Sequence, residues 1–235
     1  MKKSNKILIN LIVTIFLIFV ALSFMARTLM GDDYVSFFND HINHKLIGNK
    51  TSVSKNIPVS EFNALTASGQ FIIHLLPNHQ QLVTINTDGN LMPNIEVTVH
   101  DHTLMIHQKH DMNQRATITI GAKDLQQINL RGKNTLLGNN LQFKHLGLNL
   151  EGKNSVTLTG SAENFTINSV GKSEVKAENF LAKIVSVNLQ GKSVVSVNAL
   201  QSLQGQLLGK NRLNYVGAAT PTVNALGKNR VTKLK

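Results

Sequence analysis

Lysine recurs at a fixed place in a short motif that is repeated through the second half of the chain. The motif is a Gly-Lys-[Asn/Ser] triplet, and its six copies begin at Gly132, Gly152, Gly171, Gly191, Gly209 and Gly227. An ammonium group donates hydrogen bonds to phosphate, sulfate and carboxylate oxygens, so a column of such groups would attract a polyanion. The six lysines are Lys133, Lys153, Lys172, Lys192, Lys210 and Lys228.

The charge of the protein is concentrated around these lysines. From Lys123 to the end there are 15 Lys+Arg and 5 acids, so +10 of the formal net charge of +11 lies there, and Arg212 and Arg230 follow two residues after lysines of the motif. A one-sided cationic stripe predicts contact with anionic glycans, lipopolysaccharide or phospholipid headgroups. Nucleic acid is disfavoured, because no aromatic side chains interleave with the lysines for base stacking. The alternative is that the lysines only confer solubility and block aggregation.

The third position of the triplet predicts a structural role. Parity along a strand places this position inward or at a corner and the lysine outward. Side-chain amides and hydroxyls stacked in register satisfy one another's hydrogen bonds, so we expect a structural ladder. Its members are Asn134, Asn154, Ser173, Ser193, Asn211 and Asn229.

Histidines and the absence of cysteine bear on metal and redox chemistry. The chain has nine His and no Cys, which excludes disulfides, thiol catalysis and cysteine-ligated metals. His100, His102, His107 and His110 lie close together, and a hairpin turn at residues 101–102 would place Glu96 opposite His107. The spacing matches no compact ligand pattern, so we interpret these as exposed histidines and expect no metal and no other cofactor.

Carboxylates are too scattered in the repeats to indicate catalysis. Hydrolysis of a glycan needs a carboxylate pair, and Ca²⁺-dependent cleavage needs a carboxylate cluster. No nucleophile elbow or phosphate-binding loop is present either. We therefore expect a non-catalytic protein, with a glycan-active β-helix lyase or hydrolase as the alternative. The acids of the repeat region, Asp124, Glu151, Glu163, Glu174 and Glu178, occupy unrelated positions in their repeats.

The spacing of the triplets predicts the architecture that positions these side chains. Successive copies are 20, 19, 20, 18 and 18 residues apart, and apolar residues alternate with polar ones around each triplet. Such a unit cannot bury its apolar face alone and must stack on its neighbours. The fold class predicted is all-β, a parallel β-helix with about 18–20 residues per coil and two or three short strands in each.

The segment before the repeats also reads as β-structure. Residues 62–76 and 83–87 alternate as strands, and residues 95–99 and 104–106 flank the turn His100-Asp101-His102-Thr103 as a hairpin. We expect these strands to form the first coils of the solenoid.

The N-terminus predicts export. Lys2, Lys3 and Lys6 precede an apolar run over residues 7–26, which is long enough to cross a membrane as a helix with the N-terminus in the cytoplasm. The length favours a signal anchor, whereas Ala21-Leu22-Ser23 offers a cleavage site. The predicted organisation is a signal anchor or signal peptide over 1–30, a short amphipathic helix (to Ile47) and polar linker over 31–56, and the β-helix domain over 57–235.

Several motifs resemble one known family. These motifs are Glu61-Phe62-Asn63-Ala64-Leu65, the strand Gly69-Gln70-Phe71-Ile72-Ile73, the hairpin Asp101-His102-Thr103-Leu104-Met105-Ile106, the Gly-x-x-x-Val rungs and Tyr215-Val216-Gly217-Ala218-Ala219-Thr220-Pro221. Together they are similar to the "putative auto-transporter adhesin, head GIN domain" family. The rungs of that family are Gly-Ser-Gly-like, whereas Lys and Asn or Ser follow the glycine here.

The resemblance implies an exported bacterial right-handed β-helix with an adhesin-like or structural role in the cell envelope. We expect the protein to be inner-membrane anchored and facing the periplasm, or periplasmic or on the cell surface after cleavage. The open end of the coil allows a homo-oligomer.

Overall fold

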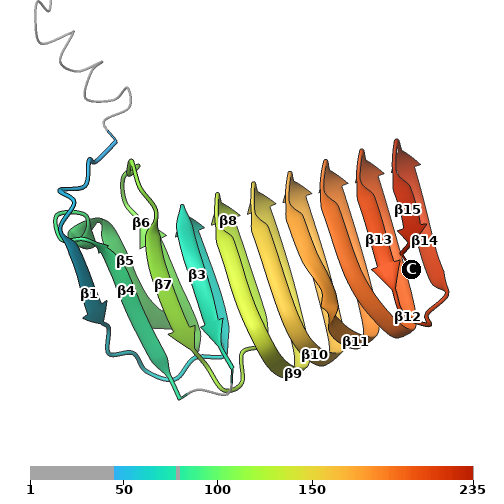
Figure 1. Cartoon of the computed structure of the whole chain (residues 1–235), viewed down its shortest axis with the longest axis horizontal. Coiled ribbons are helices and arrows are strands. Elements are labelled where there is room, and N and C mark those ends of the chain that lie inside the picture. The colour runs from blue at the N-terminus through green and yellow to red at the C-terminus, as the bar shows by residue number, and fades with distance from the viewer. Residues whose placement is uncertain (1–44, 78–79, 235) are drawn as a thin grey trace, which may run out of the picture. The chain divides into compact units, whose positions relative to one another are not determined.

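A computed structural model describes residues 45–77 and 80–234, and from Leu46 onward they form one compact unit. The unit is all-β apart from one short turn of 3₁₀-helix, η1 (Met92–Asn94), and its strands stack into a β-solenoid (Figure 1). The predicted signal anchor over 1–30 and the amphipathic helix up to residue 44 lie outside the described residues. Within the described residues no helix is long and apolar enough to cross a membrane.

The regular part of the solenoid consists of long strands that each bend around one coil. Each pairs in parallel with the next and aligns its final glycine with the final glycine of its neighbour. The sequence predicts two or three short strands per coil, but pairing continues around the bends, with small register shifts, so that each coil is a single strand. These strands are β9 (Thr135–Gly152), β10 (Ser155–Gly171), β11 (Glu174–Gly191) and β12 (Val194–Gly209), followed by the shorter β13 (Arg212–Val216), β14 (Pro221–Gly227) and β15 (Arg230–Lys233).

Alternation of apolar and polar residues explains why the coils stack. The residue four positions after each triplet glycine points inward, and in the first five triplets it is at most 1% exposed. Aromatic residues also contribute between coils, where Phe165 and Phe180 pack edge to face with ring centroids 5.0 Å apart. Burying such side chains drives the stacking, because a single coil leaves its apolar face in water.

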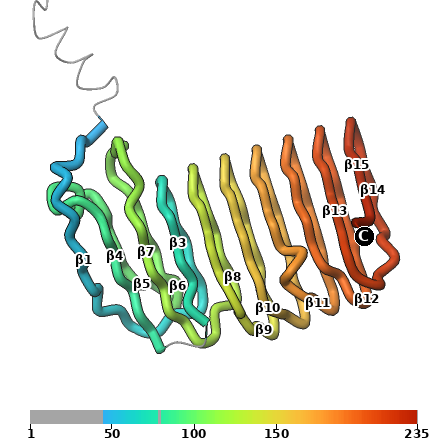
Figure 2. The backbone as a smooth tube through the Cα atoms, viewed as in Figure 1, coloured from blue at the N-terminus to red at the C-terminus, as the bar shows by residue number. Residues whose placement is uncertain are grey.

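The order of the first coils in space differs from their order in the chain. β2 (Ala64–Gly69) and β3 (Phe71–Leu76) form one coil, because the predicted strand over 62–76 breaks at the corner Gly69-Gln70. This coil lies between the coil of β6 (Thr103–Gln108) and β7 (Ala116–Gly121) and the coil of β8 (Gln127–Gly132) and β9, as Figure 2 shows for β7, β3 and β9.

Antiparallel strands cover the first coil. β4 (Leu82–Asp88) pairs with β7, β1 (Ser52–Asn56) pairs with β4, and β5 (Ile95–His100) pairs with β6 in the predicted hairpin. The expectation that all these strands form coils is therefore only partly correct. The prediction of a polar linker up to residue 56 is wrong over β1, which is a strand. The sequence did not indicate this strand, because all five of its residues are exposed and lack the apolar alternation that marks a strand.

The end of the predicted amphipathic helix is also corrected. Lys45, Leu46 and Ile47 are not helical, and Leu46 forms a parallel bridge with Met112. At the other end of the described unit, β14 and β15 hydrogen-bond to the preceding coil, through β12 and β13. The predicted homo-oligomer through this end stays a prediction.

Candidate functional site

The corners of the coils hold the six lysines in one column. The backbone N–H of each donates to the carbonyl oxygen of the glycine in the preceding coil, at 2.9 Å from Lys133 to Gly69 and at 2.8 Å for the other five. All six side chains are exposed. Adjacent coils are about 4.8 Å apart, so the column repeats one ammonium group at that interval. We call this set the lysine column.

Glycine is required beside each lysine for two physical reasons. Gly191 has φ +116°, in the region that side chains rarely adopt, and a Cβ there would lie 2.4 Å from the carbonyl oxygen of Gly171. That carbonyl oxygen also accepts the hydrogen bond from Lys192. The glycine therefore allows the close approach of coils that fixes the lysine backbone.

The third residues of the triplets form the floor beneath the lysine column. Asn154 Oδ1 accepts from the backbone N–H of Asn134 at 3.1 Å, Asn211 Oδ1 accepts from that of Ser193 at 2.9 Å, and Asn229 Oδ1 accepts from that of Asn211 at 2.8 Å. These side chains are at most 3% exposed in the first five triplets and half-buried at Asn229. We call this set the amide ladder.

Ser173 interrupts the amide ladder at its centre. Its Oγ is buried and has no partner among the described residues. Its own backbone N–H donates to Ser193 Oγ at 3.1 Å, and Ser169 fills the neighbouring inward position with Oγ 3.0 Å from Ser193 Oγ. Unlike Ser193 Oγ, the Oγ of Ser173 accepts no hydrogen bond from the triplet residue before it, Asn154, within the part of the chain that the structure describes.

Two adjoining hollows with shared lining residues form a groove along this corner of the solenoid. Its first section, with a volume of about 440 Å³, extends from Arg115 past Lys133 to Lys192 and Arg212. Its second section, of about 280 Å³, shares Lys192 and Arg212 with the first and continues to Arg230. We call the two together the corner groove.

Arg115 closes one end of the corner groove and was not found by sequence reasoning. Its Nη2 donates to the carbonyl oxygens of Phe71 and Lys133 and to Thr135 Oγ1, the last at 3.0 Å. Partial burial lowers the pKa of its guanidinium from the ordinary value of arginine. Arg115 lies outside the triplet repeat, and it meets the groove because β7 stacks directly before β3.

The corner groove is electropositive along its whole length. Six cations line the first section and the second section adds Lys210, Lys228 and Arg230. Glu174 is the one acid among the lining residues, and its Oε1 already lies 3.3 Å from Lys176 Nζ. All the cations proposed from the sequence, including Arg212 and Arg230, therefore lie along one groove.

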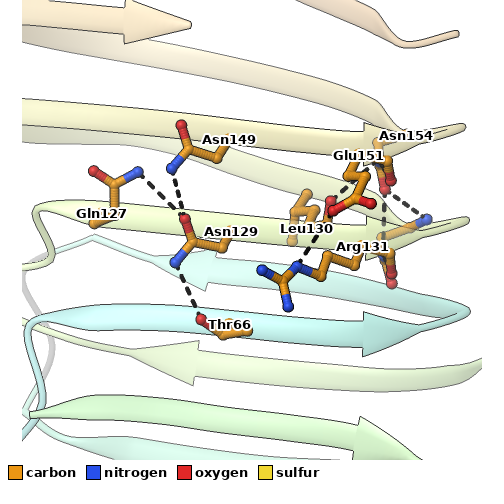
Figure 3. Close-up of polar contacts among 9 residues, drawn as sticks. Thr66, Gln127, Asn129, Leu130, Arg131, Asn149, Glu151 and Asn154 are labelled. Carbon is orange, nitrogen blue, oxygen red and sulfur yellow. Dashed lines mark hydrogen bonds and ion pairs between the residues drawn. The ribbon is translucent and has the colours of Figure 1, made fainter. Parts of the chain in front are cut away.

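A second column of asparagines was also missed. Asn149 donates from Nδ2 to Asn129 Oδ1, Asn168 to Asn149, and Asn188 to Asn168, each at 2.8 Å. Figure 3 shows the start of this outer asparagine column, where Asn129 donates to Thr66 Oγ1 at 3.1 Å. Its side chains lie on the outer surface of the coils, three residues before each triplet glycine, and aligning the triplets would have found them.

The histidines and the remaining carboxylates form no comparable site. Glu96 pairs with His107 across the hairpin as expected, and His100 Nδ1 lies 3.0 Å from Asp101 Oδ2. Within residues 45–77 and 80–234 no three His, Asp or Glu side chains cluster as metal ligands would. A cleft of about 600 Å³ near the capped end is lined by Glu61 and Asp124, among others, so two carboxylates line one cleft there.

Comparison with known proteins gives one family and several solved structures. A family model described as "Putative auto-transporter adhesin, head GIN domain" matches residues 61–219, about two thirds of the chain. No curated protein matches the chain.

One of the solved structures that match the chain supports the fold. A "putative adhesin" from Bacteroides fragilis has a TM-score of 0.63 at 20% identity, and the alignment covers 80% of this chain and 100% of that one. A "putative lipid binding protein" and a "putative adhesin", both from Parabacteroides distasonis, have TM-scores of 0.46 and 0.44 at 16% and 17% identity, with 81% of this chain and 100% of each of those covered. The first of these has the same solenoid fold at an identity too low to indicate function.

Proposed function

Because the chain belongs to the "putative auto-transporter adhesin, head GIN domain" family, we propose that it is a non-catalytic, exported, adhesin-like module of the bacterial cell envelope that contacts polyanionic envelope components through its lysine column. The observation that carries the proposal is the corner groove, in which nine cations face one acid that is already paired. Cations held in one line gain Coulomb attraction for a polyanion without having to rearrange.

Neither a tight turn nor a core requires lysine at this position. The backbone of each lysine satisfies its hydrogen bond without the side chain, and the side chain is exposed. Like charges about 5 Å apart repel by roughly 1 kcal/mol per pair in water, less with salt. Six repetitions of a destabilising residue support selection for a ligand over solubility alone.

The N-terminal segment fits the same location. Lys2, Lys3 and Lys6 before the apolar run over 7–26 would orient it as an anchor that leaves the solenoid outside the cytoplasmic membrane. In this proposal the segment is an inner-membrane anchor facing the periplasm, or a signal peptide whose removal releases the solenoid, and the coil is right-handed like the family to which it belongs.

A retention experiment tests the proposed function. The full-length protein and the triple variant Lys172→Gln, Lys192→Gln and Lys210→Gln are applied to immobilised lipopolysaccharide, anionic vesicles and heparin at about 0.15 M salt. We expect the protein to be retained and the triple variant to pass through unbound. Each ion contact releases counterions, so the affinity falls steeply when charges are removed. Equal retention of both proteins on all three supports would assign the lysines to solubility.

A glycan-active enzyme is the alternative, and the cleft lined by Glu61 and Asp124 is where it would act. Product analysis after incubation with anionic polysaccharides distinguishes the two. Cleavage that Glu61→Gln or Asp124→Asn abolishes would replace the binding proposal by an enzymatic one.

A further inference from the structure

The corner groove carries a more specific inference, which rests on the proposed function. We propose that it holds a single linear anionic polysaccharide, with one acidic group per sugar, laid along the solenoid axis from the Arg115 end toward Arg230. The ligand class follows from the shape of the charge distribution, from its spacing and from the rigidity of the floor.

The cations of the groove form a line rather than a surface. On one side of the lysine column, the residues just before the triplet glycines include Arg131 and Glu151, which pair with each other with Nε to Oε2 at 3.4 Å (Figure 3), followed by Val170 and Gln190. On the other side, beyond the groove, the strand register aligns Leu137, Thr157, Lys176, Ser196, Asn214 and Thr232.

A linear charge array selects a linear partner. Both flanking columns are close to neutral, so a flat anionic surface such as a bilayer would meet cations along one line and uncharged residues on either side. A polymer in the groove would instead meet a cation at every coil. Electrostatic complementarity therefore favours a chain molecule over a membrane surface.

The spacing of the cations limits the repeat of the polymer. One ammonium group stands at each coil, and the coils are about 4.8 Å apart. A pyranose ring extends a polysaccharide by nearly the same length, so a chain with one carboxylate, sulfate or phosphate per sugar stays in step with the column. From Lys133 to Lys228 there are five intervals, so the column would accommodate six sugars over about 24 Å.

The groove is held in shape without the ligand. Its floor is the amide ladder, in which Asn154 and Asn211 also donate from Nδ2 to Glu151 O and Leu208 O, each at 2.9 Å. Arg115 at one end is fixed by its three acceptors. A preformed floor reduces the conformational entropy lost on binding, so the affinity should depend on how many cations are engaged.

The length of the ligand provides the test. Oligogalacturonates of two, four, six, eight and twelve sugars serve as probes, and their binding to the full-length protein is measured by calorimetry over a range of salt concentrations. We expect the hexamer to bind at least about 100-fold more tightly than the dimer, because four further exposed ion contacts each contribute a few-fold. Beyond six to eight sugars the affinity should level off, and the slope of log K against log salt should grow from about −1 to about −4.

Two controls separate this inference from the proposed function. The triple variant Lys172→Gln, Lys192→Gln and Lys210→Gln should lose the length dependence, whereas Lys55→Gln, Lys109→Gln and Lys144→Gln, which remove the same charge outside the groove, should keep it. Binding that ignores ligand length, or that favours phosphatidylglycerol vesicles at equal anion concentration, would overturn the linear ligand while leaving polyanion contact in place. If the triple variant in the groove still binds both the oligogalacturonates and the vesicles as the unaltered protein does, the linear ligand and the polyanion contact are both overturned.

Discussion

Asn154 accepts two hydrogen bonds from Asn134 through one oxygen, Oδ1, which lies 3.1 Å from the backbone nitrogen and 3.2 Å from Nδ2. Both side chains are at most 2% exposed. This pair joins two coils at the corner where the backbone hydrogen bonds between strands are interrupted. The side-chain oxygen of Asn154 therefore accepts in place of a backbone carbonyl. The amide ladder is therefore part of the fold as well as the floor of the groove.

Replacing Asn154 by alanine should destabilise the protein by about 2–3 kcal/mol, because two buried donors of Asn134 lose their acceptor. Urea unfolding followed by circular dichroism measures the change. Asn168→Ala is the matched control, since this asparagine of the outer column is only half-buried on the outer surface and its loss should change stability by only about 0.5 kcal/mol. Equal losses for both variants would contradict a special role for the buried ladder.

Ser173→Asn should stabilise the protein by about 1 kcal/mol. The new Oδ1 can accept from the backbone N–H of Asn154, as Asn154 does for Asn134, and the buried Ser173 Oγ without a partner disappears. Thermal unfolding measures the gain. Ser169→Asn is the control, at a buried position four residues before Ser173. It should lower stability, because it buries an amide group outside the amide ladder. A lower melting temperature for Ser173→Asn would show that the site cannot take the larger side chain.

The regular coils were predictable because their signal is local and repeated. Six triplets at nearly constant spacing, with alternating apolar residues, define the period, the parallel pairing and the inward column before any contact is known. The capped end carries no such signal. β1 is an edge strand with five exposed residues, and its pairing with β4 follows from the three-dimensional course of the chain rather than from its own pattern.

The candidate site was predictable in its residues but not in its shape. The lysines and their floor can be read from the triplets, whereas the groove needs the residues of three adjacent columns and Arg115 from a coil that precedes the repeats in space. The position of Arg115 depends on the insertion of β2 and β3 between coils that come later in the chain. Such a change of order leaves no trace in composition or periodicity.

Gly191→Ala should destabilise the protein by about 3 kcal/mol or more, because it adds strain at φ +116° to a clash with the carbonyl oxygen of Gly171. Gly205→Ala is the control, since its φ lies outside the left-handed region and its new Cβ would meet Val223 side-chain atoms at 3.1 Å, where the half-buried valine can shift. Urea unfolding of both variants compares them. A similar loss at Gly205 would argue against the corner geometry as the cause.

The pair formed by Glu163 and Lys183 predicts a pH effect on the surface of the solenoid. The hydrogen bond from Lys183 Nζ to Glu163 Oε1, at 3.1 Å, together with its charge, lowers the pKa of the Glu163 carboxyl from the ordinary value. A lowered pKa in the folded state means that the contribution to stability is present above the pKa of the unfolded chain and is lost as the pH falls through the folded pKa. Lys183→Gln should raise the pKa of Glu163 in a carboxyl NMR titration, and Lys176→Gln should leave it unchanged.

Repulsion within the lysine column should make the stability of the protein depend on salt. The ammonium groups recur at about 4.8 Å, so each neighbour pair opposes folding by less than about 1 kcal/mol, and added salt screens this repulsion. The melting temperature should therefore rise between about 0.02 M and 0.3 M sodium chloride, and it should rise less in the variant Lys172→Gln, Lys192→Gln and Lys210→Gln, which starts from a higher value. The variant Lys55→Gln, Lys109→Gln and Lys144→Gln loses the same net charge and should keep the response of the unaltered protein. An identical salt response in all three proteins would mean that the lysines splay far enough apart to avoid one another, and the argument that a ligand must offset their mutual repulsion would then fail.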